Sequence, residues 1–365
     1  MISDRVAGLD LSGIRKVFDL AQELKDPINF SIGQPDFDVP ENILASAQDA
    51  MMSGLNSYTP TQGRSDLIDA IKQDSVKRGL QFEDGIVTSG VSGGLFLAFS
   101  ALLNPGDEVI IPDPYFLMYK QLVKFLEAEP KYVSTYPKLK LTASILEPHL
   151  TEKTKLLIFN SPGNPTGVGL TKTEMKELCE LLNKFPNLVV ISDEIYRLFH
   201  YEDEFTSLAT LKENVITLDG FSKSHSLTGW RVGWALGPKT VIQQMAKLQQ
   251  FTFVCAPSFA QKACLDAIQT DMSDYCADYK KKSELLYDLL SDKFEMQKTN
   301  GTFYSFPKVP GKYKDDQEFI EAALKKNVLI IPGNIFSEQS THFRISFATS
   351  NENIQKGAEI LRSLV

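Results

Sequence analysis

The sequence predicts an α/β fold, a mainly parallel sheet between helices, with a smaller α+β domain beside it. Two observations lead to this prediction. In the middle of the chain, short apolar runs without polar interruption alternate with amphipathic stretches, which is typical of strands buried on both faces. After about residue 270 the pattern changes to a long charged helix, short strands and a terminal helix. The length of 365 residues allows two to three structural units.

The apolar runs predict strands separated by helices. The expected strands are Ile86–Thr88, Val109–Pro112, Leu156–Asn160, Leu188–Ser192, Val215–Asp219 and Val232–Leu236. The expected helices are Gly94–Leu103, Phe116–Phe125 and Lys172–Phe185. The last helix begins with a capping box, because Thr171 precedes Glu174 by three residues. Helices between strands supply the crossovers that a parallel sheet requires.

The C-terminal part predicts a second unit. Its expected elements are a helix at Met272–Leu290, a strand at Phe303–Pro307, a helix near Gln317–Lys325, strands at Val328–Ile331 and His342–Phe347, and a helix after Ser350. We expect this unit to pack with the first forty residues. The predicted domains are therefore a large domain of residues 40–270 and a discontinuous small domain of residues 1–39 plus 271–365, with a cleft between them.

Composition narrows the class of protein. The net charge of −8 disfavours binding to nucleic acid or to an anionic membrane surface. The chain starts MISDRVAGLD and contains no apolar run of about 18 residues, so we expect a soluble, cytoplasmic protein without a membrane span. The cysteines and histidines show no spacing typical of a metal site, and we interpret Cys179, Cys255, Cys264 and Cys276 as scattered buried thiols.

Polar side chains follow three of the predicted strands. Asn160 and Asn164 follow one strand, Asp193 and Tyr196 the next, and Lys223 a third. Open α/β sheets bind ligands at the carboxyl ends of their strands, so these groups predict a site, although a structural ion pair between Asp193 and Lys223 is the simpler alternative. The glycine-rich loop 90–94 follows another strand and opens a helix, where backbone N–H groups can face an anion.

Several strings of the sequence resemble one enzyme family. The strings SPGNPTG, SDEIY, GFSKSHSLTGWRVGW and FRISFATS, in this order, resemble the class I/II aminotransferases, which are pyridoxal-phosphate enzymes of fold type I. The strings IGQPDF, NSYTPTQGRSDL and LNPGDEVIIPDPYF extend the resemblance upstream, so that it runs from about Ile28 to the end of the chain.

The resemblance implies how pyridoxal 5'-phosphate is held. Lys223 matches the lysine that carries the cofactor as a Schiff base and later moves the substrate proton. Asp193 matches the partner of the pyridine nitrogen, which keeps the ring an electron sink. Asn164 and Tyr196 match the pair that hydrogen-bonds the phenolic oxygen. Phe116 matches the aromatic side chain on the pyridine face, with Tyr115 as the alternative.

The resemblance also implies a phosphate site. Its members are Gly90, Val91 and Ser92 of the glycine-rich loop, together with Ser222 and Arg231. The family often has a serine three residues before the lysine, whereas this chain has Gly220 there. Tyr58 matches a tyrosine that reaches the phosphate from the neighbouring subunit, which implies a homodimer.

Arg344 matches the arginine that binds the substrate α-carboxylate. In the expected strand His342–Phe347, Arg344 alternates with apolar residues, so its guanidinium can point into the cleft. Gly33 and Asn164 match further residues of the substrate site.

The resemblance implies transamination between an L-amino acid and a 2-oxo acid by a ping-pong mechanism. Relatives that prefer acidic substrates supply an extra cation, sometimes a lysine at the position of Ser92. Because Ser92 is uncharged and Ile14, Phe18 and Tyr58 could form an apolar lid, we expect neutral or aromatic amino acids. Four cations that could change this expectation remain unplaced: Arg15, Lys16, Lys120 and Lys124.

Three alternatives stay open from the sequence. The first is an aspartate-type aminotransferase. The second is a pyridoxal-phosphate C–S lyase, which would use the same residues. The third is a non-catalytic regulator that binds the cofactor, although such proteins carry a DNA-binding domain ahead of the aminotransferase part and this chain is acidic.

Overall fold

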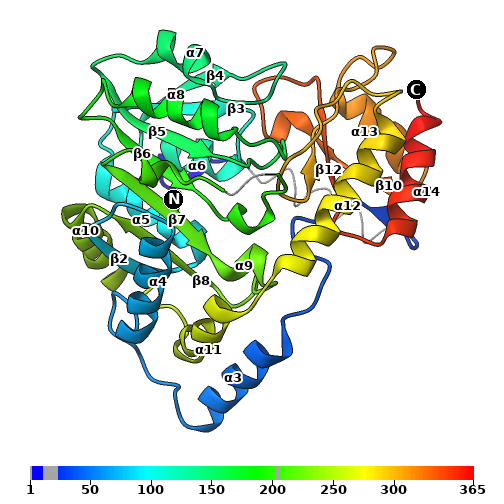
Figure 1. Cartoon of the computed structure of the whole chain (residues 1–365). Helices are drawn as coiled ribbons and strands as arrows, with labels where there is room; N and C mark the ends of the chain where they lie inside the picture. Colours follow the sequence, from blue (N-terminus) through cyan, green and yellow to red (C-terminus); the bar gives the residue numbers. More distant parts are fainter. Residues whose placement is uncertain (1, 11–23, 203–204) are drawn as a thin grey trace.

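The computed structural model describes residues 2–10, 24–202 and 205–365. A seven-stranded sheet forms the centre of the larger part of the molecule (Figure 1). Its order is β2-β8-β7-β6-β5-β3-β4. The strands are β2 (Asp84–Ser89), β3 (Glu108–Asp113), β4 (Glu129–Ser134), β5 (Thr154–Asn160), β6 (Val189–Asp193), β7 (Val215–Gly220) and β8 (Val232–Gly237).

The sheet is parallel except at β8. This strand pairs antiparallel with both β2 and β7. Only the short helix α9 (Phe221–Ser224) and a turn separate β7 from β8, so the chain returns beside β7 without a crossover. The predicted α/β fold with a mainly parallel sheet is confirmed.

Helices cover both faces of the sheet. The helices α5 (Gly90–Leu102), α6 (Leu117–Phe125) and α10 (Lys239–Gln250) pack on one face, whose core includes Val109 and Ile111. The helices α4 (Ser65–Lys77), α7 (Ala143–Leu146), α8 (Lys172–Leu182) and α11 (Ser258–Gln269) pack on the other, whose core includes Ile110. Two more helices lie outside these layers: α3 (Glu41–Met52) packs against α11, and α1 (Asp4–Ala7) packs against α6. Successive strand residues thus enter two different cores, which explains the uninterrupted apolar runs.

The smaller part contains short strands and three longer helices. The strand β1 (Ile28–Asn29) pairs parallel with β10 (Val328–Leu329). The strands β11 (Ile331–Pro332), β12 (Phe343–Ser346) and β9 (Tyr304–Ser305) form an antiparallel sheet. Around them lie α12 (Ser273–Leu290), α13 (Asp316–Leu324) and α14 (Asn351–Arg362), on the opposite side of the molecule from α10 and β2 (Figure 1).

The predicted elements differ from the structure at a few places. The helix expected from Gly94 begins at Gly90, so the glycine-rich loop forms its first turn. The edge strand β4 was not expected, because its polar residues are mostly exposed. The strand β12 is confirmed, but all four of its residues are buried, Arg344 included. The four cysteines are free; Cys179 and Cys264 are buried as expected, whereas Cys255 and Cys276 are only half-buried.

Within the described ranges, no helix has the length and apolar character needed to cross a lipid bilayer. The cytoplasmic location stays a prediction.

Candidate active site

A cavity of about 440 Å³ lies where β5, β6, α5 and α9 meet the smaller part of the molecule. Its walls contain most of the residues that the sequence singled out, although these lie far apart in the chain. They are Gly33, Val91, Ser92, Phe116, Asn164, Asp193, Tyr196, Ser222, Lys223, Arg231 and Arg344.

The Lys223 amine lies in the cavity. It belongs to α9, directly after β7, and its Nζ donates a hydrogen bond to the backbone oxygen of Gly33 at 2.6 Å. Burial, together with the positive charges of Arg344 and Arg231, lowers the pKa of Lys223 to about 8. A neutral, nucleophilic amine is therefore far more accessible than for a lysine in water.

Asp193 ends β6 with its carboxylate buried, since only 3% of the residue is exposed. The Tyr119 hydroxyl donates to Asp193 Oδ2 at 2.7 Å, and the backbone N–H of Ile195 donates to Oδ1 at 3.3 Å. Burial raises the pKa of Asp193 to about 6, against the opposing effect of the Tyr119 hydrogen bond. A buried cationic partner would restore the ionised form.

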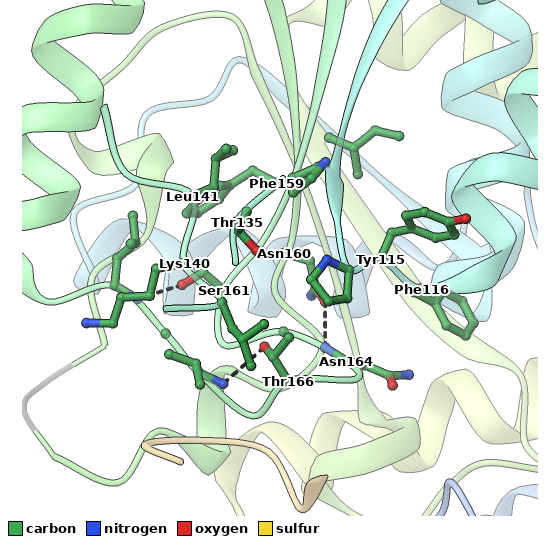
Figure 2. Close-up of a pocket in the computed structure, with 18 of the residues that line it drawn as sticks. Tyr115, Phe116, Thr135, Lys140, Leu141, Phe159, Asn160, Ser161, Asn164 and Thr166 are labelled. Carbon is green, nitrogen blue, oxygen red and sulfur yellow. Dashed lines mark hydrogen bonds between the residues drawn. The ribbon is translucent and has the colours of Figure 1, made fainter. Parts of the chain in front are cut away.

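Asn164 stands between the main cavity and a smaller one of about 40 Å³, both of which it lines. Figure 2 shows the smaller cavity, with the hydrogen bond from the backbone N of Asn164 to Asn160 Oδ1, which measures 2.9 Å. The Asn160 side chain also donates to the backbone oxygen of Asp193 at 2.8 Å. These bonds fix the loop after β5 against the end of β6.

Phe116, rather than Tyr115, is the aromatic side chain of the PDPYF string that lines the main cavity. Of the two cavities, Tyr115 lines only the smaller one, and its hydroxyl donates to Glu338 Oε1 at 2.5 Å. Figure 2 labels both rings.

One end of the cavity suits an anion. Gly90 begins α5 with a φ of +67°, and Ser89 before it provides no side-chain cap, so the first N–H groups of the helix lack a side-chain acceptor. The Arg231 guanidinium packs on Gly90, where a Cβ would lie 2.4 Å from Nη2. It donates to the backbone oxygens of Thr228 and Ser89. Gly90 itself supports this end without lining the cavity.

Arg344 also lines the cavity, with 2% of its surface exposed. Its Nη1 donates to Asn164 Oδ1 at 3.1 Å and its Nη2 donates to the backbone oxygen of Ser31 at 2.9 Å. The Tyr304 and Phe336 rings lie 4.4 and 4.6 Å from its Cζ. The buried Nε has no hydrogen-bond partner among the residues that the structure describes.

Neither Arg231 nor Arg344 is neutralised by a carboxylate of the described residues. Among the residues that the structure describes, the ion pairs include neither Arg231 nor Arg344. A ligand that is anionic at both ends would therefore match the charge of the cavity.

Some expected residues lie elsewhere. Tyr58 is 85% exposed and does not line the cavity of its own chain. Lys120 forms an ion pair with Glu338, and Lys124 lies 3.8 Å from Asp10, so neither is a free cation of the site. The remaining candidates, Ile14, Arg15, Lys16 and Phe18, lie outside the described residues.

Two tyrosines of the site were missed. Tyr119 lines the cavity three residues after Phe116 on the same side of α6, a spacing that could have indicated it. Tyr304 lines the cavity from β9, and no motif at that position had singled it out.

Comparison with known proteins agrees with this geometry. Residues 25–361 match the family described as aminotransferase class I and II. The chain is 35% identical to a probable aspartate aminotransferase of Methanocaldococcus jannaschii over 100% of both chains. It is 31% identical to aromatic-amino-acid aminotransferase 2 of Thermococcus litoralis, over 100% of this chain and 98% of that protein.

A solved structure shows the same fold. The aspartate aminotransferase of Thermus thermophilus with maleate superposes with a TM-score of 0.94 and 31% identity over 100% of both chains. The family match spans nearly the whole chain, and the relatives align from end to end. The chain therefore belongs to the class I and II aminotransferases and is a pyridoxal-phosphate-dependent transaminase.

Proposed function

We propose that this enzyme transfers the amino group of a neutral or aromatic L-amino acid to a 2-oxo acid, in two half-reactions that use the same cavity. The observation that carries this proposal is the set of cations on the cavity wall. In the part of the chain that the structure describes, these are Lys223, Arg231 and Arg344. The first suits the cofactor aldehyde, the second its phosphate and the third the substrate α-carboxylate, so no described cation remains for an acidic side chain.

The residues fit pyridoxal phosphate. The uncapped first turn of α5, the Ser222 hydroxyl and the unpaired Arg231 suit the phosphate. Asp193, which is buried and forms no ion pair with the described residues, suits the protonated pyridine nitrogen, and Phe116 lines the same cavity. When bound, the cofactor supplies an electron-withdrawing ring that stabilises negative charge at the substrate Cα.

Lys223 moves the proton. With its pKa lowered to about 8, its Nζ is a base near neutral pH that can take the proton from Cα of the amino donor in one half-reaction and deliver a proton to Cα of the product amino acid in the other. Its hydrogen bond to the Gly33 backbone holds Nζ on the substrate side of the cavity. Asn164 and Tyr196 face the same space and are the proposed donors to the phenolic oxygen of the cofactor.

Arg344 binds the α-carboxylate. Its guanidinium is the cation at the end of the cavity away from Arg231, and the small Gly33 lets the carboxylate approach beside it. The uncharged Ser92 and the apolar Ile32 and Leu95 also line the cavity and suit a neutral substrate side chain.

We also propose that two chains form a dimer in which Tyr58 completes the site of the neighbouring subunit. Tyr58 is 85% exposed, so its side chain is accessible to a second chain, and Phe251 is 78% exposed. The division into residues 40–270 and residues 1–39 plus 271–365 belongs to the same proposal, and the pairing of β1 with β10 supports it.

The role of Lys223 is tested by Lys223→Ala. We expect this variant to lose the visible absorption of the loaded enzyme near 400 nm, about the wavelength expected when a lysine holds the cofactor covalently, and to lose transamination. Borohydride treatment followed by mass spectrometry detects the covalent adduct. An adduct that persists in Lys223→Ala would show that another lysine holds the cofactor.

The substrate class is tested with a panel of amino donors and either 2-oxoglutarate or pyruvate. We expect a higher kcat/KM for phenylalanine, leucine and alanine than for aspartate. The Ser92→Lys variant should shift the ratio toward aspartate, because it adds a cation to the three described ones, each of which already has a proposed role. A parent enzyme that prefers aspartate would identify an aspartate-type aminotransferase, and release of ammonia and pyruvate from a cysteine conjugate without amino exchange would favour the lyase.

A further inference from the structure

Tyr304 contacts both functional ends of the cavity. It lies on β9 with 1% of its surface exposed. Its hydroxyl is 3.3 Å from the Tyr196 hydroxyl, and its ring lies 4.4 Å from the Arg344 Cζ. Tyr196 is the proposed hydrogen-bond donor to the cofactor, and Arg344 is the proposed binder of the substrate carboxylate. The Tyr304 side chain therefore touches one group that serves the cofactor and one that serves the substrate.

The hydroxyls of Tyr196 and Tyr304 carry one proton each, so each can donate only one hydrogen bond. In the structure, Tyr196 donates to Tyr304. If Tyr196 donates to an oxyanion in the cavity, its single proton is used there, and Tyr304 must become the donor to Tyr196. A hydroxyl that accepts a hydrogen bond is a stronger donor, so this reversal would strengthen the bond from Tyr196 to the oxyanion.

The ring of Tyr304 acts on Arg344. The guanidinium lies between the Tyr304 and Phe336 rings, and Asn164 and Ser31 accept hydrogen bonds from its two terminal nitrogens. The rings restrict its plane and the acceptors restrict rotation within that plane. A guanidinium fixed in this way loses little entropy when a carboxylate binds.

Gly33 leaves room for this arrangement. A Cβ at Gly33 would lie 2.9 Å from the Tyr304 hydroxyl oxygen, closer than real Cβ atoms approach. The same glycine accepts the hydrogen bond from Lys223. The Tyr304 hydroxyl therefore occupies a defined position between Gly33 and Tyr196.

We propose that Tyr304 is a positioning residue that couples the two ends of the site, because its hydroxyl orients the hydroxyl of Tyr196 and its ring fixes the plane of the Arg344 guanidinium. This inference rests on the proposed roles of Tyr196 and Arg344. It makes separate predictions for the hydroxyl and for the ring, and both are measured without turnover.

The hydroxyl is tested with Tyr304→Phe in the loaded enzyme. A hydrogen bond from Tyr196 to the phenolic oxygen of the cofactor stabilises the negative charge on that oxygen, and so favours the deprotonated form of the bound cofactor. Weaker donation should therefore raise the pH at which the visible absorption changes, by about 0.2 to 0.5 unit. The dissociation constant of 3-phenylpropionate, which has a carboxylate but no amino group, should stay within about twofold because the ring remains. An unchanged pH midpoint would overturn the role of the hydroxyl.

The ring is tested with Tyr304→Leu and with Phe336→Leu as the matched control. Both variants should weaken 3-phenylpropionate binding by about 3- to 30-fold, since each removes one face of the guanidinium sandwich. Only Tyr304→Leu should also move the pH midpoint, because Phe336 has no hydroxyl. Unchanged binding in Tyr304→Leu would overturn the role of the Tyr304 ring, whatever Phe336→Leu shows.

Arg344→Ala separates this inference from the proposed function. If this variant binds 3-phenylpropionate as well as the parent does, the carboxylate binds elsewhere and the proposed function fails. If Arg344→Ala loses binding while the two leucine variants keep it, the proposed function stands and the coupling through Tyr304 fails.

Discussion

Two ionisable side chains of the site have pKa values that differ from those they would have in water. Burial raises the pKa of Asp193 to about 6 and lowers that of Lys223 to about 8. Both shifts move the group toward its neutral form, so the site without ligand carries an electrostatic cost that a bound cofactor can offset. Stability and function therefore make opposite demands on these two side chains.

The electrostatic cost of burying the Asp193 carboxylate predicts how the free energy of unfolding depends on pH. Because its pKa in the folded protein lies above the ordinary value of 3.8, the folded state binds more protons than the unfolded state between about pH 4 and pH 6. The free energy of unfolding must then fall as the pH rises through that window, by roughly 3 kcal/mol in total. Asp193→Asn should remove this cost and stabilise the cofactor-free protein at about pH 8, with a gain about half as large at pH 5.

Urea denaturation of the cofactor-free variants measures this gain. Tyr119→Phe is the matched control, because it removes the hydroxyl that donates to the ionised Asp193 and should destabilise the protein at about pH 8, by roughly 1.5 to 3 kcal/mol. If Asp193→Asn is less stable than the parent at that pH, Asp193 is ionised and well compensated in the folded protein.

The residues of the site differ in how far the sequence predicts them. Lys223, Asp193 and Asn164 follow buried strands, and the chemistry of strand ends together with the motifs indicates them. Tyr119 and Tyr304 act through contacts with Asp193 and Tyr196, which lie 74 and 108 positions away in the chain. A contact between distant segments depends on how the layers pack, and no local pattern reports it.

Among the elements, the loop after β5 depends most on one position. Gly167 has a φ of +69°, and a Cβ there would lie 2.1 Å from the backbone oxygen of Tyr304. The backbone oxygen of Gly167 also accepts hydrogen bonds from the N–H groups of Asn300 and Gly301. This contact joins the loop that carries Asn164 to the segment that carries Tyr304.

Gly167→Ala should therefore destabilise the protein by more than about 3 kcal/mol, through both the backbone strain and the overlap. Gly54→Ala is the control, because Gly54 has a φ of +89° but nothing within 4 Å of its Cβ position, and it should cost only about 1 to 2 kcal/mol. Thermal unfolding compares the two variants. Equal losses would show that the loop moves aside to accept the methyl group.

Elements are predictable where burial leaves a pattern. Strands such as β5 and β7 enter two cores and give continuous apolar runs, so the sequence indicates them within a residue or two. The edge strand β4 has mostly exposed residues, and β10 and β11 have only two residues each, so that their boundaries depend on tertiary pairing. The connection between β7 and β8 is short already in the sequence, but the antiparallel pairing of β8 with both β7 and β2 is seen only in the assembled sheet.

At the scale of the whole molecule, the proposed dimer gives a test that uses two inactive proteins. In a mixed dimer of Lys223→Ala and Tyr58→Ala chains, one site contains the intact Lys223 of the second chain and the intact Tyr58 of the first. If Tyr58 acts across the interface, mixing under exchange conditions should restore activity at one site per mixed dimer.

Transaminase assays of the mixture and of each parent variant measure this recovery. The control is the same mixture of variants with Val365→Glu added to each chain, a substitution that adds a charge at an exposed position beyond α14. It shows whether surface charge alone changes the exchange of chains between dimers. Activity that never exceeds the sum of the two variants would show that Tyr58 does not complete the site of a partner.

The pairing of β1 with β10 has a consequence for how the protein is made. Ile28 aligns with Val328, so a ribosome synthesises the first strand 300 residues before its partner. At about 5 to 20 residues per second this interval lasts roughly 15 to 60 seconds. Throughout it, the core that the segment around Phe30 enters is incomplete, since most of that core is built from residues after Tyr279. The cavity, which needs Gly33 and Arg344 together, is therefore completed only near the end of synthesis, and nascent chains should depend on chaperones to shield this segment until then.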